Sequence, residues 1–172
     1  MKKLAALGAA LLVSLLCLGF FPLCGERMVR EARLVLCTNN LKRIGELADI
    51  YRKSGFGGDG YCWPGEIPEE LGAGWHRIIR DRLARGGDEE TIFRCPLDNR
   101  VPRNEIDYRG PSRSPNVSTN YGTDDAIAGD RLGNHGDTAV EPLNVLTKRY
   151  RVITIRPSDT LRWEQYLAGT QD

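Results

Sequence analysis

The chain is organised around one segment, Glu26–Lys53, which reads ERMVREARLVLCTNNLKRIGELADIYRK. Apolar residues recur in it at steps of three and four, the spacing that gives a helix an apolar stripe. They are Met28, Val29, Ala32, Val35, Leu36, Leu41, Ile44, Leu47, Ala48, Ile50 and Tyr51. Charged residues fill the other face, so we predict an amphipathic stalk helix over residues 25–54. Gly55 fits a C-cap at its end.

An uncharged apolar run, Leu4–Cys24, precedes the stalk and follows Met1-Lys2-Lys3. Twenty apolar residues in a helix rise about 30 Å, which is enough to cross a membrane. We therefore predict a membrane anchor or signal segment over residues 1–24. An uncleaved anchor places the chain in the inner membrane as a single-pass protein, with its C-terminal domain in the periplasm. A cleaved signal peptide would leave it periplasmic or secreted, and a lipid-attached cysteine is a third reading.

The remaining residues, 55–172, are predicted to form a loop-rich α+β head, because the chain holds 19 Gly and 9 Pro. Alternating and helical patterns predict short helices within 66–85, strands at 91–96 and within 121–131, a hairpin of 143–147 with 150–155, and a last helix at 160–168. Ser158 or Asp159 would cap that helix. The polar stretch 97–120 is expected to be loop. The fold class is thus α+β, with a long N-terminal helix packed on a small antiparallel sheet.

The charge balance argues against one class of partner. Lys and Arg number 24 and Asp and Glu 23, a net charge of +1. A protein that binds nucleic acid through its overall charge is strongly basic. We expect no nucleic-acid partner.

Five short motifs occur in a fixed order along the chain. The first is Ala32–Gly45 (ARLVLCTNNLKRIG), and Phe93–Asp98 (FRCPLD), Tyr108–Pro111 (YRGP), Asn134–Gly136 (NHG) and Asn144–Leu146 (NVL) come after it. In this order they resemble type II secretion pseudopilin-like proteins, in particular the prepilin-like subset with an H-X9-DG C-terminal region. The positions that match are Cys37, Asn40, Leu41, Gly45, Cys95, Pro96, Asn134, His135, Gly136, Asn144, Val145 and Leu146.

The resemblance implies a pilin-like fold and a non-enzymatic role. The protein would be a component or accessory of a type II secretion or type IV pilus-like assembly. It would contact other pseudopilin-like subunits or secretion-assembly proteins through the apolar stripe of the stalk, and the membrane through its N-terminal helix.

The chain also departs from that family at two places. Members carry a Gly-Phe-Thr-Leu-x-Glu peptidase site before the apolar run, whereas Met1-Lys2-Lys3 leads directly into Leu4 here. Lys148-Arg149-Tyr150 stands where the family has Asp-Gly. These departures favour an alternative, an exported binding module that keeps the fold without entering a filament. A hydrolase would require a cluster around His135 in a deep pocket.

The cysteines suggest a disulfide, because export would permit one. Cys62 and Cys95 are the predicted pair. Two buried free thiols, or Cys37 taking one of the partners, are the alternatives. Zinc is disfavoured, because no C-x-x-C pair occurs and His76 and His135 lack ligand spacing.

No catalytic or cofactor-binding residue is predicted. His135 is expected to bond backbone in the loop before the hairpin, and His76 to lie on the surface or to pack. Calcium is a weak candidate at Asp124, Asp125, Asp130 and Asp137, because this ion prefers several oxygen ligands from one loop. Solvated turns are the alternative for these four residues.

Overall fold

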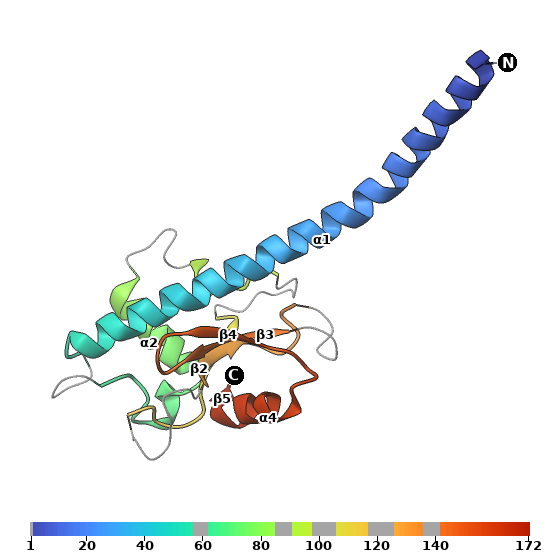
Figure 1. Cartoon of the computed structure of the whole chain (residues 1–172). Coiled ribbons are helices and arrows are strands. Elements are labelled where there is room, and N and C mark those ends of the chain that lie inside the picture. Colours follow the sequence, from blue (N-terminus) through green and yellow to red (C-terminus); the bar gives the residue numbers. More distant parts are fainter. Residues whose placement is uncertain (1, 57–61, 85–90, 98–105, 117–125, 136–141) are drawn as a thin grey trace. The chain divides into compact units, whose positions relative to one another are not determined.

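A long helix, α1, runs from Lys2 to Lys53 and opens the fold (Figure 1). The computed structural model describes residues 2–56, 62–84, 91–97, 106–116, 126–135 and 142–172, with side chains from residue 28 onward. The chain divides into two units, Met1–Val35 and Leu36–Asp172. The predicted end of the helix is confirmed, since Gly55 takes a positive φ of 72° just beyond Lys53.

The second unit is built on a five-stranded antiparallel sheet in the order β4-β3-β2-β1-β5. The strands are β1 (Tyr108–Pro111), β2 (Ala126–Asp130), β3 (Leu143–Thr147), β4 (Val152–Ile155) and β5 (Thr170–Gln171). The predicted hairpin is confirmed as β3 and β4, with Leu146 opposite Val152. Its bend is closed by a bond from the Tyr150 backbone N–H to the Thr147 carbonyl, and Tyr150 has a positive φ of 59°.

Both faces of the sheet are covered, because β3 buries every one of its residues. On one face Leu146 joins the core formed with α1 residues such as Leu41 and Ile44. On the other, Leu143 and Val145 pack with helix α4 (Thr160–Gly169). Successive side chains of β3 point to opposite faces of the sheet and therefore join two different hydrophobic cores. Figure 1 shows the sheet between α1 and α4.

Close contact between α1 and β3 depends on Gly45. A Cβ atom at this position would lie 3.0 Å from Leu146 Cδ1. The absence of a side chain lets the helix backbone approach the sheet, and Leu146 is completely buried against it.

The shorter helices agree with the sequence pattern. A 3-10 turn at Pro68–Glu70 and helix α2 (Ala73–Leu83) fall in the region predicted to hold one or two helices. Of the two residues predicted to cap α4, Asp159 does so, because its Oδ1 accepts a bond from the Arg162 backbone N–H at 3.3 Å.

Three predictions are wrong. Residues 91–97 form a turn rather than a strand, closed by a bond from the Arg94 backbone N–H to the Thr91 carbonyl. The stretch 97–120 is not all loop, since it contains β1. The stalk does not carry one continuous stripe: Leu41, Ile44, Leu47, Ala48 and Tyr51 are buried, whereas Met28, Val29, Val35, Leu36 and Ile50 are exposed.

The predicted anchor over residues 1–24 lies outside the described side chains. Among the helices whose side chains are described, none is long and apolar enough to cross a membrane.

Candidate functional site

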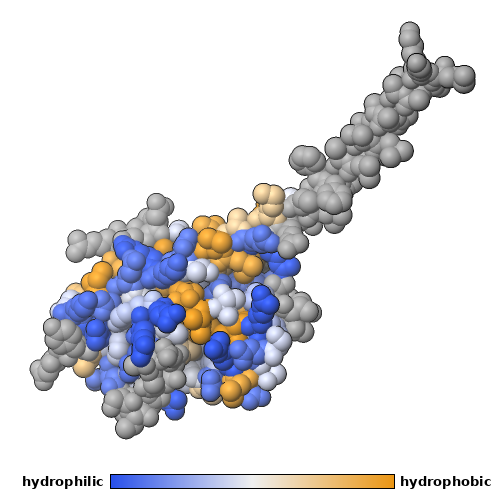
Figure 2. Space-filling view, viewed as in Figure 1, coloured by the Kyte–Doolittle hydropathy of each residue, from blue (hydrophilic) through white to orange (hydrophobic). Residues whose placement is uncertain are grey.

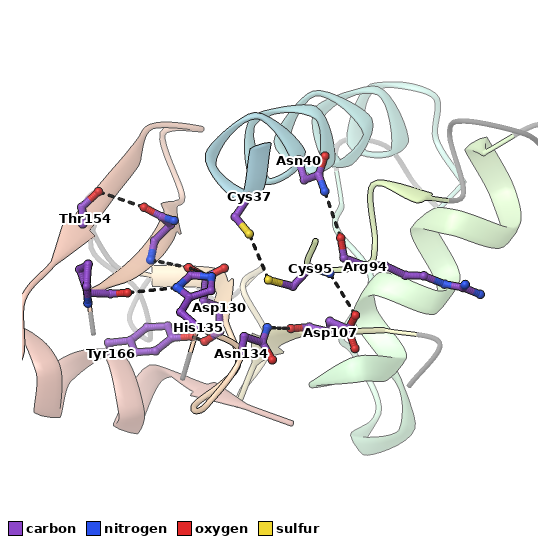
Figure 3. Close-up of polar contacts among 12 residues, drawn as sticks. Cys37, Asn40, Arg94, Cys95, Asp107, Asp130, Asn134, His135, Thr154 and Tyr166 are labelled. Atoms are coloured by element: carbon purple, nitrogen blue, oxygen red, sulfur yellow. Dashed lines mark hydrogen bonds and ion pairs between the residues drawn. The ribbon is translucent and has the colours of Figure 1, made fainter. Parts of the chain in front are cut away.

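Two cysteines that are far apart in sequence meet beneath α1. Cys37 projects from the helix, Cys95 from the turn 91–97, and their sulfur atoms lie 3.0 Å apart (Figure 3). Cys37 is completely buried and Cys95 is 2% exposed. The turn is tied to the helix beside them, because Asn40 Nδ2 donates to the Arg94 carbonyl at 3.1 Å.

The backbone around Cys95 is held from the sheet side. The Cys95 N–H donates to Asp107 Oδ2 at 3.0 Å, and the Asp107 N–H donates to the Phe93 carbonyl at 2.9 Å. The side chain of Asn134 donates to the Asp107 carbonyl. The position of the Cys95 thiol is therefore fixed by hydrogen bonds with α1 on one side of the turn and with Asp107 on the other.

A histidine and a carboxylate complete the cluster. His135 Nε2 lies 3.4 Å from Asp130 Oδ2, and both residues are buried. Asp130 Oδ2 also accepts a bond from the Asn144 backbone N–H at 2.7 Å. His135 Nδ1 lies 3.2 Å from the Pro142 carbonyl, which can only accept, so Nδ1 carries a proton and Nε2 faces the acidic groups.

The surroundings shift the proton affinity of each member of the cluster. A hydrogen bond with Cys37, assisted by His135, lowers the pKa of Cys95 against the effect of burial. The bond with Cys95, together with burial, raises the pKa of Cys37. Burial raises the pKa of Asp130 to about 7 despite the nearby imidazole. Burial lowers the pKa of His135, but the contacts with Cys95 and Asp130 outweigh it and raise that pKa above its ordinary value.

The arrangement offers two kinds of chemistry. Cys95, His135 and Asp130 have the residue types of a thiol, base and acid series, and Cys37, Cys95 and His135 hold their ligand atoms within 4.8 Å of one another, as metal ligands would. Exposure of 2% for Cys95 and 7% for His135 closes the sulfur off from a substrate in solution. Chemistry between the two thiols themselves needs no such access.

The predicted disulfide between Cys62 and Cys95 does not form in this structure. None of the three described cysteines takes part in a disulfide; Cys95 faces Cys37, and Cys62 is half-buried. The reason is the position of α1, which contacts the turn 91–97. Cys37 on this helix therefore faces Cys95, where the sequence predicts Cys62.

Of the four predicted calcium residues, the structure describes only Asp130. Asp130 is buried and occupied by Asn144 and His135, which is unlike an exposed cation site. Asp124, Asp125 and Asp137 lie outside the described residues. The expected role of His135 is confirmed by its bond to the Pro142 backbone. His76 is packed in the interior and not on the surface.

Three residues of the cluster went unnoticed in the sequence. Asp107 is buried and bonds the Cys95 backbone, and Tyr166 donates from its hydroxyl to the Asp130 carbonyl. Thr154 Oγ1 donates to Asn144 Oδ1 at 3.0 Å. In the sequence, Asp107 is marked only by the aromatic residue that follows it, Tyr108, and such a pair is too common to indicate a site.

The positions that carry the resemblance gather in one place. Among them Cys37, Leu41, Gly45, Cys95, Asn134, His135, Asn144, Val145 and Leu146 are buried, Asn40 and Pro96 are half-buried, and Gly136 lies outside the described residues. Six of them take part in the polar contacts around the two cysteines: Cys37, Asn40, Cys95, Asn134, His135 and Asn144. Leu41, Gly45 and Leu146 lie where α1 packs on β3, and Val145 packs towards α4 on the other face of the sheet. Most of the motif positions therefore lie where α1 meets the sheet and the turn 91–97.

A cleft lined by both basic and apolar residues lies on the opposite face of the sheet, beside α4. It has a volume of about 530 Å³, and Val145, Ile155 and Tyr166 are among the residues that line it. Arg113, Arg151 and Arg162 also line it.

Fold and cluster together define an α+β protein in which a long N-terminal helix is packed on an antiparallel sheet over a buried cysteine–histidine cluster. Searches against protein-family models, curated proteins and solved structures found no match.

Proposed function

We propose that the protein is a non-enzymatic, pseudopilin-like component or accessory of a type II secretion or type IV pilus-like assembly, acting through protein–protein contacts of α1. The observation that carries the proposal is a set of exposed apolar side chains on this helix. Met28 is 70% exposed, Val29 50% and Val35 58%.

The spacing of these residues supports lateral packing of helices. Met28 and Val35 are seven residues apart, and Ala32, also exposed, lies between them at a step of four from Met28. In a helix of 3.6 residues per turn, such residues share one face and form a seam that a second helix can cover. Exposed apolar residues that form a contiguous face mark interaction sites more often than scattered ones do.

Two further observations support a role without catalysis. The thiol–histidine cluster is buried, and a reacting group must be within hydrogen-bond reach of its substrate. Residues of the family motifs contribute to the packing between α1 and the sheet. In a subunit with a stalk helix, this packing fixes the head domain to the helix.

Photocrosslinking from the seam tests this proposal. A photoreactive phenylalanine analogue is placed at Met28 or Val35 in the full chain, in membranes of its own host. The matched control position is Arg30, two residues from Met28 and therefore on another face of the helix. We expect adducts with a second copy or with pseudopilin-like subunits from Met28 and Val35 only. Equal labelling from Arg30, or adducts with lipid alone, would contradict lateral packing.

One observation favours the second candidate, an exported binding module. The cleft beside α4 is lined by Val145 and Ile155 as well as by Arg113, Arg151 and Arg162, a composition that suits an anionic ligand with an apolar part. Figure 2 shows hydrophobic patches between hydrophilic ones on one face of the molecule.

Titration calorimetry with dodecanoate tests the second candidate, because this probe has one carboxylate and an apolar chain. Arg151→Ala is expected to weaken binding about tenfold, in line with the loss of one charge-assisted hydrogen bond. Arg156→Ala removes an exposed arginine that does not line the cleft, and should leave binding unchanged. No saturable binding by the unmodified protein would rule the cleft out for such ligands.

A further inference from the structure

We propose that Cys37 and Cys95 form an intramolecular disulfide that fastens α1 to the turn beneath it, a bond that does not include Cys62. The proposal goes beyond the function proposed above and does not depend on it, because it concerns the joint within the head. The two sulfur atoms lie 3.0 Å apart in the buried interior, and an S–S bond of about 2.0 Å requires an approach of about 1 Å.

The surrounding bonds hold the two cysteines in place for that approach. Asn40, one turn along α1 from Cys37, donates to the carbonyl of Arg94, the residue before Cys95. On the other side Asp107 accepts from the Cys95 N–H. A hydrogen bond therefore holds the chain on each side of the sulfur pair, and these two bonds keep the cysteines facing each other (Figure 3).

The distance favours a covalent pair over a metal site. Two thiolates on a tetrahedral zinc ion, with Zn–S bonds of about 2.3 Å, stand about 3.8 Å apart. The Cys37 and Cys95 sulfurs are closer than that.

The reaction is a thiol–disulfide exchange with a low-molecular-weight disulfide, RSSR, as the oxidant. Cys95 reacts as the thiolate, whose formation the contacts with Cys37 and His135 favour. It attacks one sulfur of RSSR, forms a mixed disulfide and releases RS⁻. Cys37 loses its proton and attacks Cys95 Sγ, which forms the Cys37–Cys95 bond and releases a second RS⁻. Both thiolates take up the two protons, so one RSSR is reduced to two RSH.

Because both sulfur atoms are buried, thiol–disulfide exchange cannot begin in the closed structure. The first attack needs access to Cys95, so it occurs before the turn closes beneath α1 or when the turn opens locally. Once formed, the bond would be shielded from reductants by the same packing.

Differential alkylation of the full chain tests the proposal. The protein is refolded with oxidised and reduced glutathione, denatured without reductant, and blocked with one alkylating reagent. After reduction a second reagent labels the thiols that had been in disulfides. We expect the second label on Cys37 and Cys95 and the first on Cys62. Cys62→Ser is the matched control and should give the same pair.

Three outcomes would overturn the proposal. One is the first label on both Cys37 and Cys95; another is a linkage that includes Cys62. The third is zinc bound at one equivalent per chain, with both thiols protected until a chelator is added, which would make the cluster a metal site.

A stability measurement on the same protein needs no cysteine variant. The residues are 58 apart in sequence, so the bond closes a long loop. Reduction should lower Tm by roughly 10 °C. An unchanged Tm would contradict a native crosslink, whatever partners α1 has.

Discussion

The two histidines of the chain are both buried, yet they lie in opposite electrostatic surroundings. His76 packs against the rings of Trp75, Phe93 and Tyr108, at centroid distances of 5.1, 6.2 and 6.3 Å. His135 lies beside Asp130 and Cys95. Each bonds one backbone carbonyl, His76 that of Arg109 at 3.0 Å and His135 that of Pro142 at 3.2 Å.

The difference shows that burial alone does not set the state of a histidine. Burial lowers the pKa of His76 to about 4, so this ring is neutral and acts as an aromatic side chain with one hydrogen bond. The acidic neighbours of His135 reverse the effect of burial and raise its pKa. His76 lies in an aromatic core, whereas His135 lies in a polar joint formed with Cys37, Cys95 and Asp130. We expect these two regions to respond differently to mutation, pH and redox conditions.

The largest effect is expected from Asp130→Ala, which dismantles the polar joint. The change leaves the Asn144 N–H without its acceptor and His135 without the carboxylate, both in the interior. We expect a loss of roughly 3–5 kcal/mol in the free energy of unfolding, measured with urea at pH 7. Asp159→Ala, which removes the cap of α4, should cost only about 1 kcal/mol. Equal losses would show that the joint carries no special stability.

Acid should weaken the aromatic region through the protonation of His76. The pKa of His76 is about 4 in the folded chain and 6.5 as a free side chain, so between these values the unfolded state binds more protons. Its contribution to stability is present above pH 6.5 and is lost as pH falls through this window. Relative to His76→Phe, the unmodified protein should lose about 3 kcal/mol between pH 6.5 and pH 4. Parallel pH profiles of the two proteins would contradict a neutral His76.

His135→Gln should alter the redox equilibrium of the proposed disulfide. The contact with His135 stabilises the Cys95 thiolate, which belongs to the reduced protein. Without it, the equilibrium with glutathione should shift towards the disulfide by roughly tenfold. The measurement is the disulfide fraction across a series of glutathione ratios. A shift towards the reduced form would contradict this role, and the same assay on His76→Phe should show no shift.

The smallest effect is expected from His76→Phe at neutral pH. The phenyl ring keeps the packing with Trp75 and Phe93 and loses only the bond to the Arg109 carbonyl. A loss of about 1 kcal/mol in the free energy of unfolding is expected. His135→Phe should cost more, because it leaves Asp130 buried beside an apolar ring. A larger loss of unfolding free energy in His76→Phe than in His135→Phe would contradict the difference between the two regions.

Elements whose patterns are local could be predicted from the sequence. The spacing of apolar residues predicted the helix that ends at Lys53, and alternation predicted β3 and β4. The strand expected at 91–96 was wrong, because a short apolar run next to Pro96 is equally compatible with a turn. β1 and β5 were missed, because their strands are short and rich in Gly, Pro and polar residues.

The candidate site was predicted only in part for the same reason. Its members were noticed one by one: Cys95 as a disulfide partner, His135 as a loop residue, Asp130 as a calcium candidate, and Cys37 as a motif position and an alternative disulfide partner. Their meeting depends on contacts across 58 residues between the two cysteines, and no local spacing encodes such a contact.

The sequence by itself thus determined the helix, the hairpin and the α+β class, because the periodicity of apolar residues follows directly from backbone geometry. Only the tertiary structure decided which side of α1 is buried, which cysteine faces Cys95, and why the pKa values of two histidines with the same chemistry shift in opposite directions. Those outcomes depend on which segments pack together, since burial and neighbouring charge, rather than residue type, set the pKa of a side chain.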